Sequence, residues 1–175
     1  MEYIIKACGI IMVIFATTAY GMVLCADLKK RLSELKEIKK IIFLLIGEIS
    51  FGHTPFFEAA GMISGRVSKP FDAVLKRLEG EGRDMNGENA ASVWKKVWKK
   101  ESDALSISSH ERERLYELGE SLGLSDADTQ KRALEEYAKE LETEISGLEK
   151  SVPVKTRLYG SLGIMCGVFI AIIIV

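Results

Sequence analysis

Two long apolar stretches, residues 3–26 and 158–175, flank a charged middle segment and constrain this chain more than any other feature. The chain has 24 basic and 25 acidic residues, and all of them except Glu2 and Lys6 lie between the two stretches. About 20 apolar helical residues are enough to cross a bilayer core about 30 Å thick. The sequence therefore predicts three parts: an N-terminal transmembrane helix at 1–26, a water-soluble domain at 27–157 and a C-terminal transmembrane helix at 158–175.

Basic residues on the inner flanks of the two stretches predict the orientation in the membrane. They are Lys29, Lys30, Arg31, Lys36, Lys39, Lys40, Lys150, Lys155 and Arg157, against Lys6 alone on the outer side. Because Lys and Arg accumulate in cytoplasmic flanks, we expect the middle segment in the cytoplasm and both termini outside. The basic cluster follows the first apolar stretch, whereas a cleaved signal peptide carries its basic residues before it.

Apolar residues recur every three or four positions through the middle segment, which predicts an all-α bundle of about six helices. The stripe of the first helix, residues 27–51, is Leu28, Leu32, Leu35, Ile38, Ile42, Leu45 and Ile49. The last helix has a seven-residue repeat: Leu134, Tyr137, Leu141, Ile145 and Leu148. These two helices have opposite charge bias, so we expect antiparallel pairing. Gly147 and Pro153 predict a bend before the second apolar stretch.

Turn and capping residues separate the predicted helices. Gly52 can adopt the positive φ of a helix end, Thr54 can cap the next helix and Pro55 suits its first turn. A second group lies near the start of the last helix: Gly119, Gly123, Ser125 and Asp126. Asn89 and the pair Ser108 and Glu111 predict two further helix starts. The glycine-rich segment 80–87 predicts a loop without regular structure.

Trp94 and Trp98 lie one helical turn apart among four lysines, in Trp-Lys-Lys-Val-Trp-Lys-Lys. One interpretation is a basic aromatic patch that binds lipid head groups or nucleic acid. The other is that both indoles are buried on one helix face while the lysines are solvated. We expect burial, and the net charge of −1 gives no sign of a nucleic-acid binder.

No motif in the sequence predicts catalysis. His53 and His110 are the only histidines, and neither has Cys, Asp or Glu at the spacing of a metal site. The three cysteines lie in or beside the apolar stretches, and the glycine motifs of nucleotide-binding sites are absent. We therefore expect neither an enzyme nor a cofactor or metal.

Small residues recur every four positions in both apolar stretches. They are Gly163, Gly167 and Ala171 in the second stretch and Thr17, Gly21 and Cys25 in the first. Such spacing lets two helices approach closely in lipid, so it predicts helix packing. The alternative is that these are ordinary small residues facing lipid.

Taken in order, these features resemble the stage III sporulation protein AB family. The segments that carry the resemblance are Gly52-His53-Thr54-Pro55-Phe56-Phe57-Glu58-Ala59 and Leu118-Gly119-Glu120-Ser121-Leu122-Gly123, with Asp126 and Gln130. That family is similar to the cytoplasmic helical domain of type II secretion F-type platform proteins. The resemblance implies a non-catalytic membrane platform in the complex between mother cell and forespore of a sporulating cell.

The resemblance also implies partners, namely a companion secretion-type ATPase and other membrane components, besides lipid and possible further copies of the chain. Because the long helices use their apolar faces to build the bundle, we expect the partner contact at His53, Glu58 and Gln130. The alternative is that residues of these turns only cap helices. An alternative function is a membrane-tethered signalling regulator that sequesters a soluble enzyme.

Overall fold

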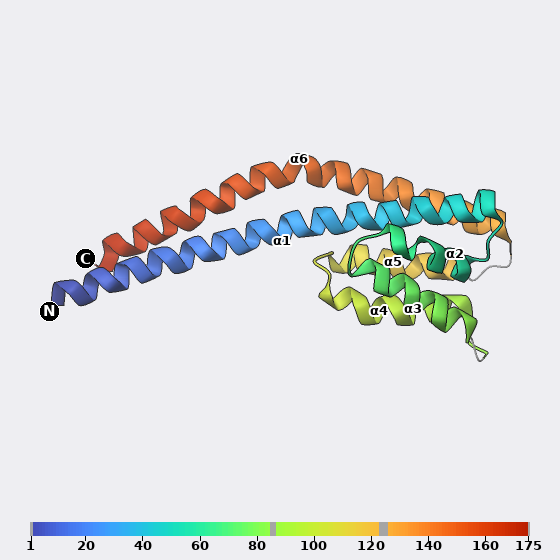
Figure 1. Cartoon of the computed structure of the whole chain (residues 1–175). Coiled ribbons are helices and arrows are strands. Elements are labelled where there is room, and N and C mark those ends of the chain that lie inside the picture. Colours follow the sequence, from blue (N-terminus) through green and yellow to red (C-terminus); the bar gives the residue numbers. More distant parts are fainter. Residues whose placement is uncertain (1, 85–86, 123–125, 175) are drawn as a thin grey trace. The chain divides into compact units, whose positions relative to one another are not determined.

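The computed structural model describes residues 2–84, 87–122 and 126–174, with only the backbone of residues 2–8, 10, 127, 171, 173 and 174. All regular structure in these ranges is helical, as predicted (Figure 1). The elements are α1 (Glu2–Gly52), α2 (Phe56–Ile63), η1 (Ser64–Arg66), α3 (Phe71–Arg83), α4 (Ala90–Glu101), η2 (Ser102–Ala104), α5 (Ser109–Leu122) and α6 (Ala127–Ile174). The chain forms two compact units: a terminal unit of Met1–Leu32 and Ser146–Val175, and a central unit of Ser33–Ile145.

In the terminal unit, α1 and α6 run antiparallel and approach closely through glycine. A Cβ atom at Gly21 would lie 2.8 Å from the Tyr159 carbonyl oxygen, and one at Gly163 would lie 2.9 Å from the Thr17 carbonyl oxygen. A Cβ at Gly167 would lie 2.6 Å from Thr17 Oγ1. Glycine is therefore the residue that lets the two backbones come this close. The side chain of Ala171 lies outside the described residues.

Many large apolar side chains of the terminal unit are exposed, including Met12, Phe15, Tyr20, Met165 and Phe169. Among the described residues, one helical stretch, Ile11–Gly52, is long and apolar enough to cross a membrane, with a mean hydropathy of 1.8 in its most apolar window. The second span predicted at 158–175 stays a prediction. α6 is one continuous helix with Pro153 inside it, although proline cannot donate the backbone hydrogen bond of that turn. The bend expected there also stays a prediction.

The central unit is built around large buried side chains from all six helices. They include Leu35, Ile38, Ile42, Leu45 and Ile49 of α1, Phe56 and Ile63 of α2, Phe71, Leu75 and Leu78 of α3, Trp94 and Trp98 of α4, Leu115 and Leu118 of α5, and Leu134, Tyr137, Leu141 and Ile145 of α6. The predicted stripes of the first and last helices are thus confirmed over this unit. Lys39 of α1 and Glu142 of α6 form an ion pair at 3.3 Å.

The turn between α1 and α2 differs from the prediction. α1 ends at Gly52, but the positive φ, 49°, falls on His53. Pro55 is the N-cap residue of α2 and no side chain caps this helix, so the predicted cap by Thr54 is wrong. The Thr54 N–H instead donates to the Glu48 carbonyl at 3.3 Å, which satisfies a carbonyl at the C-terminal end of α1.

α3 continues to Arg83, beyond the point where the glycine-rich composition predicted a loop. Gly82 explains the difference, because a Cβ atom there would lie 2.2 Å from the ring of Phe57. The contact with α2 therefore requires glycine at this position of α3. The packing of Phe57 against Gly82 offsets the poor helix propensity of glycine. The Arg83 guanidinium also forms an ion pair with Glu79, one turn earlier. Residues 85 and 86 of the predicted loop lie outside the described residues.

Two predicted helix starts are confirmed. The Asn89 side chain caps α4, where it accepts a hydrogen bond from the Ser92 N–H at 2.8 Å. Ser108 and Glu111 form a reciprocal capping box at the start of α5. The Ser108 N–H donates to Glu111 Oε2 at 2.6 Å, and the Glu111 N–H donates to Ser108 Oγ at 3.2 Å.

Candidate functional site

The α1–α2 turn presents an exposed apolar side chain beside polar ones. Phe51, in the last turn of α1, is 89% exposed, and Met62 of α2 is 57% exposed. His53 and Glu58, two of the predicted contact residues, are also exposed. Aromatic residues supply much of the binding energy of protein interfaces, so an exposed phenylalanine beside polar groups is a candidate anchor for a partner. We call Phe51, His53, Glu58 and Met62 the turn surface.

Trp94 connects the start of α2 to the Leu118–Gly119 segment. Its indole is fully buried, with its ring centroid 5.6 Å from that of Phe56. Its Nε1–H donates to the Leu115 carbonyl at 2.7 Å. A Cβ atom at Gly119 would lie 2.3 Å from Trp94 Cδ1. Gly119 lies inside α5, and its missing side chain leaves the space that the Trp94 indole occupies. The predicted turn or cap at this residue is therefore wrong.

Asp126 lies immediately before α6 and accepts hydrogen bonds from backbone N–H groups in the first turn of that helix. Its carboxylate accepts hydrogen bonds from the N–H groups of Asp128 at 3.0 Å and of Thr129 at 3.2 Å. The hydrogen bonds from Thr129 and Asp128 lower the pKa of the Asp126 carboxyl, although desolvation opposes them. The structure thus places Asp126 as the cap, whereas Gly123 and Ser125, predicted for this turn, lie outside the described residues.

Gln130, the third predicted contact residue, is occupied within the fold. Its Nε2–H donates to the carbonyl of Leu122, the last residue of α5, at 3.0 Å. The amide thereby joins the end of α5 to the first turns of α6, and the side chain is half-buried. The structure therefore leaves His53 exposed in the turn and Glu58 exposed in the first helical turn of α2, but it gives Gln130 an internal hydrogen-bond partner.

Phe51 and Met62 were missed by the sequence analysis as candidate contact residues. Phe51 lies two positions after Ile49, the last buried residue of the α1 stripe, and therefore points away from the core. This offset from the stripe was visible in the sequence. Met62 had no such signal, because α2 is apolar on nearly every face and only the packing of its neighbours shows which side is covered.

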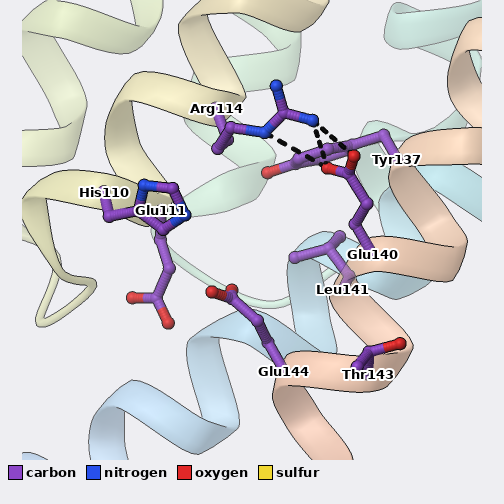
Figure 2. A pocket seen from close by; sticks show the side chains of 8 residues that line it. All are labelled: His110, Glu111, Arg114, Tyr137, Glu140, Leu141, Thr143 and Glu144. Carbon is purple, nitrogen blue, oxygen red and sulfur yellow. Dashed lines mark hydrogen bonds and ion pairs between the residues drawn. The ribbon is translucent and has the colours of Figure 1, made fainter.

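A pocket of about 350 Å³ lies between α5 and α6 (Figure 2). It is lined by His110, Glu111, Arg114, Tyr137, Glu140, Leu141, Thr143 and Glu144. Figure 2 shows Arg114 of α5 paired with Glu140 of α6, and the Arg114 Nε–Glu140 Oε2 distance is 3.2 Å. Arg114 also binds Glu117 at 2.8 Å. The hydrogen bonds that Arg114 donates to Glu140 and then to Glu117 raise the pKa of Arg114, so the guanidinium stays charged and pairs α5 with α6 while Glu140 is ionised.

The chemistry of this pocket is that of a structural ion pair. Burial, followed by the charges of Glu144 and Glu111, raises the pKa of the Tyr137 hydroxyl well above its ordinary value. The hydroxyl is therefore protonated at neutral pH and cannot act as a base there. In the parts of the chain that the structure describes, no three His, Cys, Asp or Glu side chains are placed to hold a metal ion. None of the predicted contact residues lines the pocket.

Known proteins of one family match this chain in sequence and in structure. The family model described as Stage III sporulation protein AB (spore_III_AB) matches residues 6–175. Stage III sporulation protein AB of Bacillus subtilis (strain 168) is 24% identical over 170 residues, which cover 97% of this chain and 99% of that protein. A solved structure of stage III sporulation protein AB (SpoIIIAB) has a TM-score of 0.64 at 25% identity, over 71% of this chain and 97% of that one.

Proposed function

Because this chain belongs to the stage III sporulation protein AB family and is therefore a sporulation protein, we propose that it acts as a non-catalytic membrane platform. In this function the terminal unit holds the protein in the mother-cell membrane facing the forespore. The central unit lies in the cytoplasm and engages a companion secretion-type ATPase. The likeness that the family bears to type II secretion F-type platform proteins supports this proposal.

The observation that carries the proposal is the turn surface. Phe51 is almost fully exposed at the end of a helix whose other face is packed into the core. Interfaces draw most of their binding energy from a few aromatic or Arg anchors, surrounded by polar residues that exclude water. We expect Phe51 to be the aromatic anchor of the interface and His53 and Glu58 to be polar residues at its edge.

The binding experiment compares two phenylalanines of the same helix. Full-length protein in detergent is used to pull down the purified ATPase, with Phe51→Ser as the test and Phe43→Ser as the matched control. Phe43 is 53% exposed in the same unit and lies eight residues before Phe51. An anchor aromatic contributes about 2 kcal/mol or more, so Phe51→Ser should weaken binding about 30-fold or more at unchanged thermal stability.

Equal affinity of the two variants would show that the turn surface is not the contact. His53→Ala and Glu58→Ala should each weaken binding by less than Phe51→Ser, as expected of surrounding polar residues. Gln130→Ala should instead lower stability by about 1 kcal/mol, since it removes a half-buried internal hydrogen bond. If the protein binds a kinase, a phosphatase or a sigma factor in place of the ATPase, the regulator hypothesis is favoured.

The proposed topology has its own test. A reporter that folds only in the cytoplasm should be inactive when fused after Val175 and active when inserted at Gly87. The basic residues that flank the apolar stretches are the physical reason, because they resist transfer across the membrane. Activity of the fusion after Val175 would overturn the topology but would leave the ATPase contact open to the binding experiment.

A further inference from the structure

Charges of opposite sign lie on two separate faces of the central unit. One is the exposed side of α4, formed by Lys95, Lys96, Lys99 and Lys100, which we call the lysine face. The other is the exposed side of α5, formed by Glu113, Glu117 and Glu120, which we call the glutamate face. The whole chain has a net charge of only −1, so this separation is a property of the fold and not of composition.

The packing of α4 on α5 directs the two faces away from each other. Successive residues of a helix are about 100° apart, so side chains three or four positions apart share a face. Trp94 of α4 points at α5, because it packs over Gly119 and binds the Leu115 carbonyl. The lysines therefore lie on the side of α4 remote from α5. Since Leu115 and Gly119 face α4, the three glutamates lie on the remote side of α5.

Much of the charge on these faces is not compensated within the chain. In the described ranges Lys95, Lys99 and Lys100 form no ion pair, while Lys96 binds Glu81 at 3.1 Å and Glu88 at 3.8 Å. On the other face Glu113 and Glu120 form none in those ranges, and Glu117 binds Arg114. Like charges one helical turn apart repel each other by a few tenths of a kcal/mol. Each face would therefore gain from contact with the opposite charge.

We propose that copies of this chain associate head to tail, with the lysine face of one copy on the glutamate face of the next. The two faces differ and lie on remote sides of the α4–α5 pair, so the contact is heterologous and can repeat into a ring or a row. A lipid surface or nucleic acid would cover the lysine face alone. A second copy supplies complementary charge for both faces. This inference does not depend on the proposed function.

The test uses neutral substitutions, which remove one face without creating a new complementary one. Lys95→Gln/Lys99→Gln neutralises two unpaired lysines of the lysine face, and Glu113→Gln/Glu120→Gln neutralises the two unpaired glutamates of the glutamate face. Within the described residues none of these four forms an ion pair, so both variants should keep the thermal stability of the parent protein. Masses of the full-length proteins in detergent are measured by light scattering at low ionic strength.

The parent protein should form species larger than a monomer. Each variant alone should associate with a dissociation constant raised about tenfold or more. An equimolar mixture of the two should give a dimer and nothing larger, because each variant retains only the face that the other lacks. Added salt should return the parent protein to monomers, since ions at 1 M screen exposed charges beyond about 3 Å.

Several results would overturn the proposal. The parent protein could be monomeric at low ionic strength, either variant could assemble as the parent does, or the mixture could fail to pair. A different occupant would be shown if Lys95→Gln/Lys99→Gln lost binding to vesicles containing anionic lipid while the mass distribution stayed that of the parent. Growth of the mixture beyond a dimer would likewise contradict a single contact between these two faces.

Discussion

The terminal and central units both pack helices against each other, but one does so with glycine and the other with tryptophan. In the terminal unit Gly21 and Gly163 bring two backbones into contact and leave large apolar side chains exposed. In the central unit Trp94 and Trp98 are fully buried, and each meets other aromatic rings. Helices that associate in lipid gain no hydrophobic free energy, so their association depends on close backbone packing. Helices that associate in water gain free energy by burying apolar area, so their association depends on large apolar side chains.

Hydroxyls inside helices behave alike in the two units, since Thr143 of the central unit also donates to a carbonyl one turn earlier, that of Lys139 at 3.1 Å. The polar groups differ at the helix starts. In the terminal unit the hydroxyls of Thr17 and Ser161 donate to carbonyls of their own helices, at 3.1 Å to Val13 and 3.0 Å to Arg157. In the central unit the Asn89 side chain accepts an N–H at a helix start. In apolar surroundings a hydroxyl finds no hydrogen-bond acceptor outside its helix, so it donates to a carbonyl of the same helix. Helix starts exposed to water need caps that fix where each helix begins.

The largest expected effect concerns the tryptophans of the central unit. Trp94→Ala should lower the free energy of unfolding by about 3 to 5 kcal/mol, because it removes a fully buried indole and leaves a cavity. Lys95→Ala, the exposed neighbour, is the matched control and should change it by less than about 0.5 kcal/mol. Thermal unfolding of the two variants compares them directly. Equal stability of both would contradict burial as the function of Trp94.

The next prediction tests close packing in the terminal unit. Gly163→Leu should destabilise the protein by about 1 to 3 kcal/mol, because its Cβ would meet the Thr17 backbone and force the helices apart. Gly160→Leu is the control, since a Cβ at that position meets nothing within 4 Å. Thermal unfolding in detergent measures both. If the two variants behave alike, the glycines do not hold this unit together.

A smaller effect should distinguish the two helix starts in the central unit. Asn89→Ala should cost about 1 kcal/mol, since the Asn89 side chain caps α4. Thr54→Ala should cost only a few tenths, because α2 has no side-chain cap. Chemical denaturation of the two variants gives the comparison. A larger loss for Thr54→Ala would mean that its hydroxyl caps α2 after all.

The smallest effect is a dependence on pH at the start of α6. The pKa of Asp126 is lowered in the folded protein, so the stabilisation due to its charge is fully present above the unfolded pKa of about 3.9. That contribution is lost as the pH falls through the folded pKa. The difference in thermal midpoint between the parent protein and Asp126→Asn should therefore vanish in acid. A difference that is constant down to pH 2 would contradict the charged cap.

The fold was largely predictable because the signals that specify it are periodic. The stripe of α1 and the repeat of α6 identify helices by spacing alone, and the pair of Trp94 and Trp98 predicted a buried face. The helix ends were less predictable, because they depend on tertiary contacts. From the sequence, Gly82 is predicted to lie in a loop. In the structure it is helical, and the ring of Phe57 occupies the space where a Cβ atom would lie.

The candidate site was predicted only in part. The sequence predicts His53 in a turn and Glu58 at the start of the helix that follows it, and the exposure of both agrees with a contact surface. It could not show that Gln130 is engaged by the Leu122 carbonyl, since that depends on how α5 meets α6. The exposure of Met62 likewise depends on which side of α2 its neighbours cover.

Residues 105–108, which link η2 to α5, are held in place by carboxylates of two helices. Leu105 and Ile107 are buried, while the N–H of Ser106 donates to Glu34 Oε2 at 2.6 Å and that of Ser108 donates to Glu111. Side chains that alternate in this way, with N–H groups bound every second residue, are what an edge strand has in a sheet. Here the neighbouring strand is replaced by two carboxylates on helices. Leu105 itself has extended backbone angles, φ −87° and ψ 148°. Proline has no N–H, so at position 106 or 108 it would lose the hydrogen bond to the carboxylate.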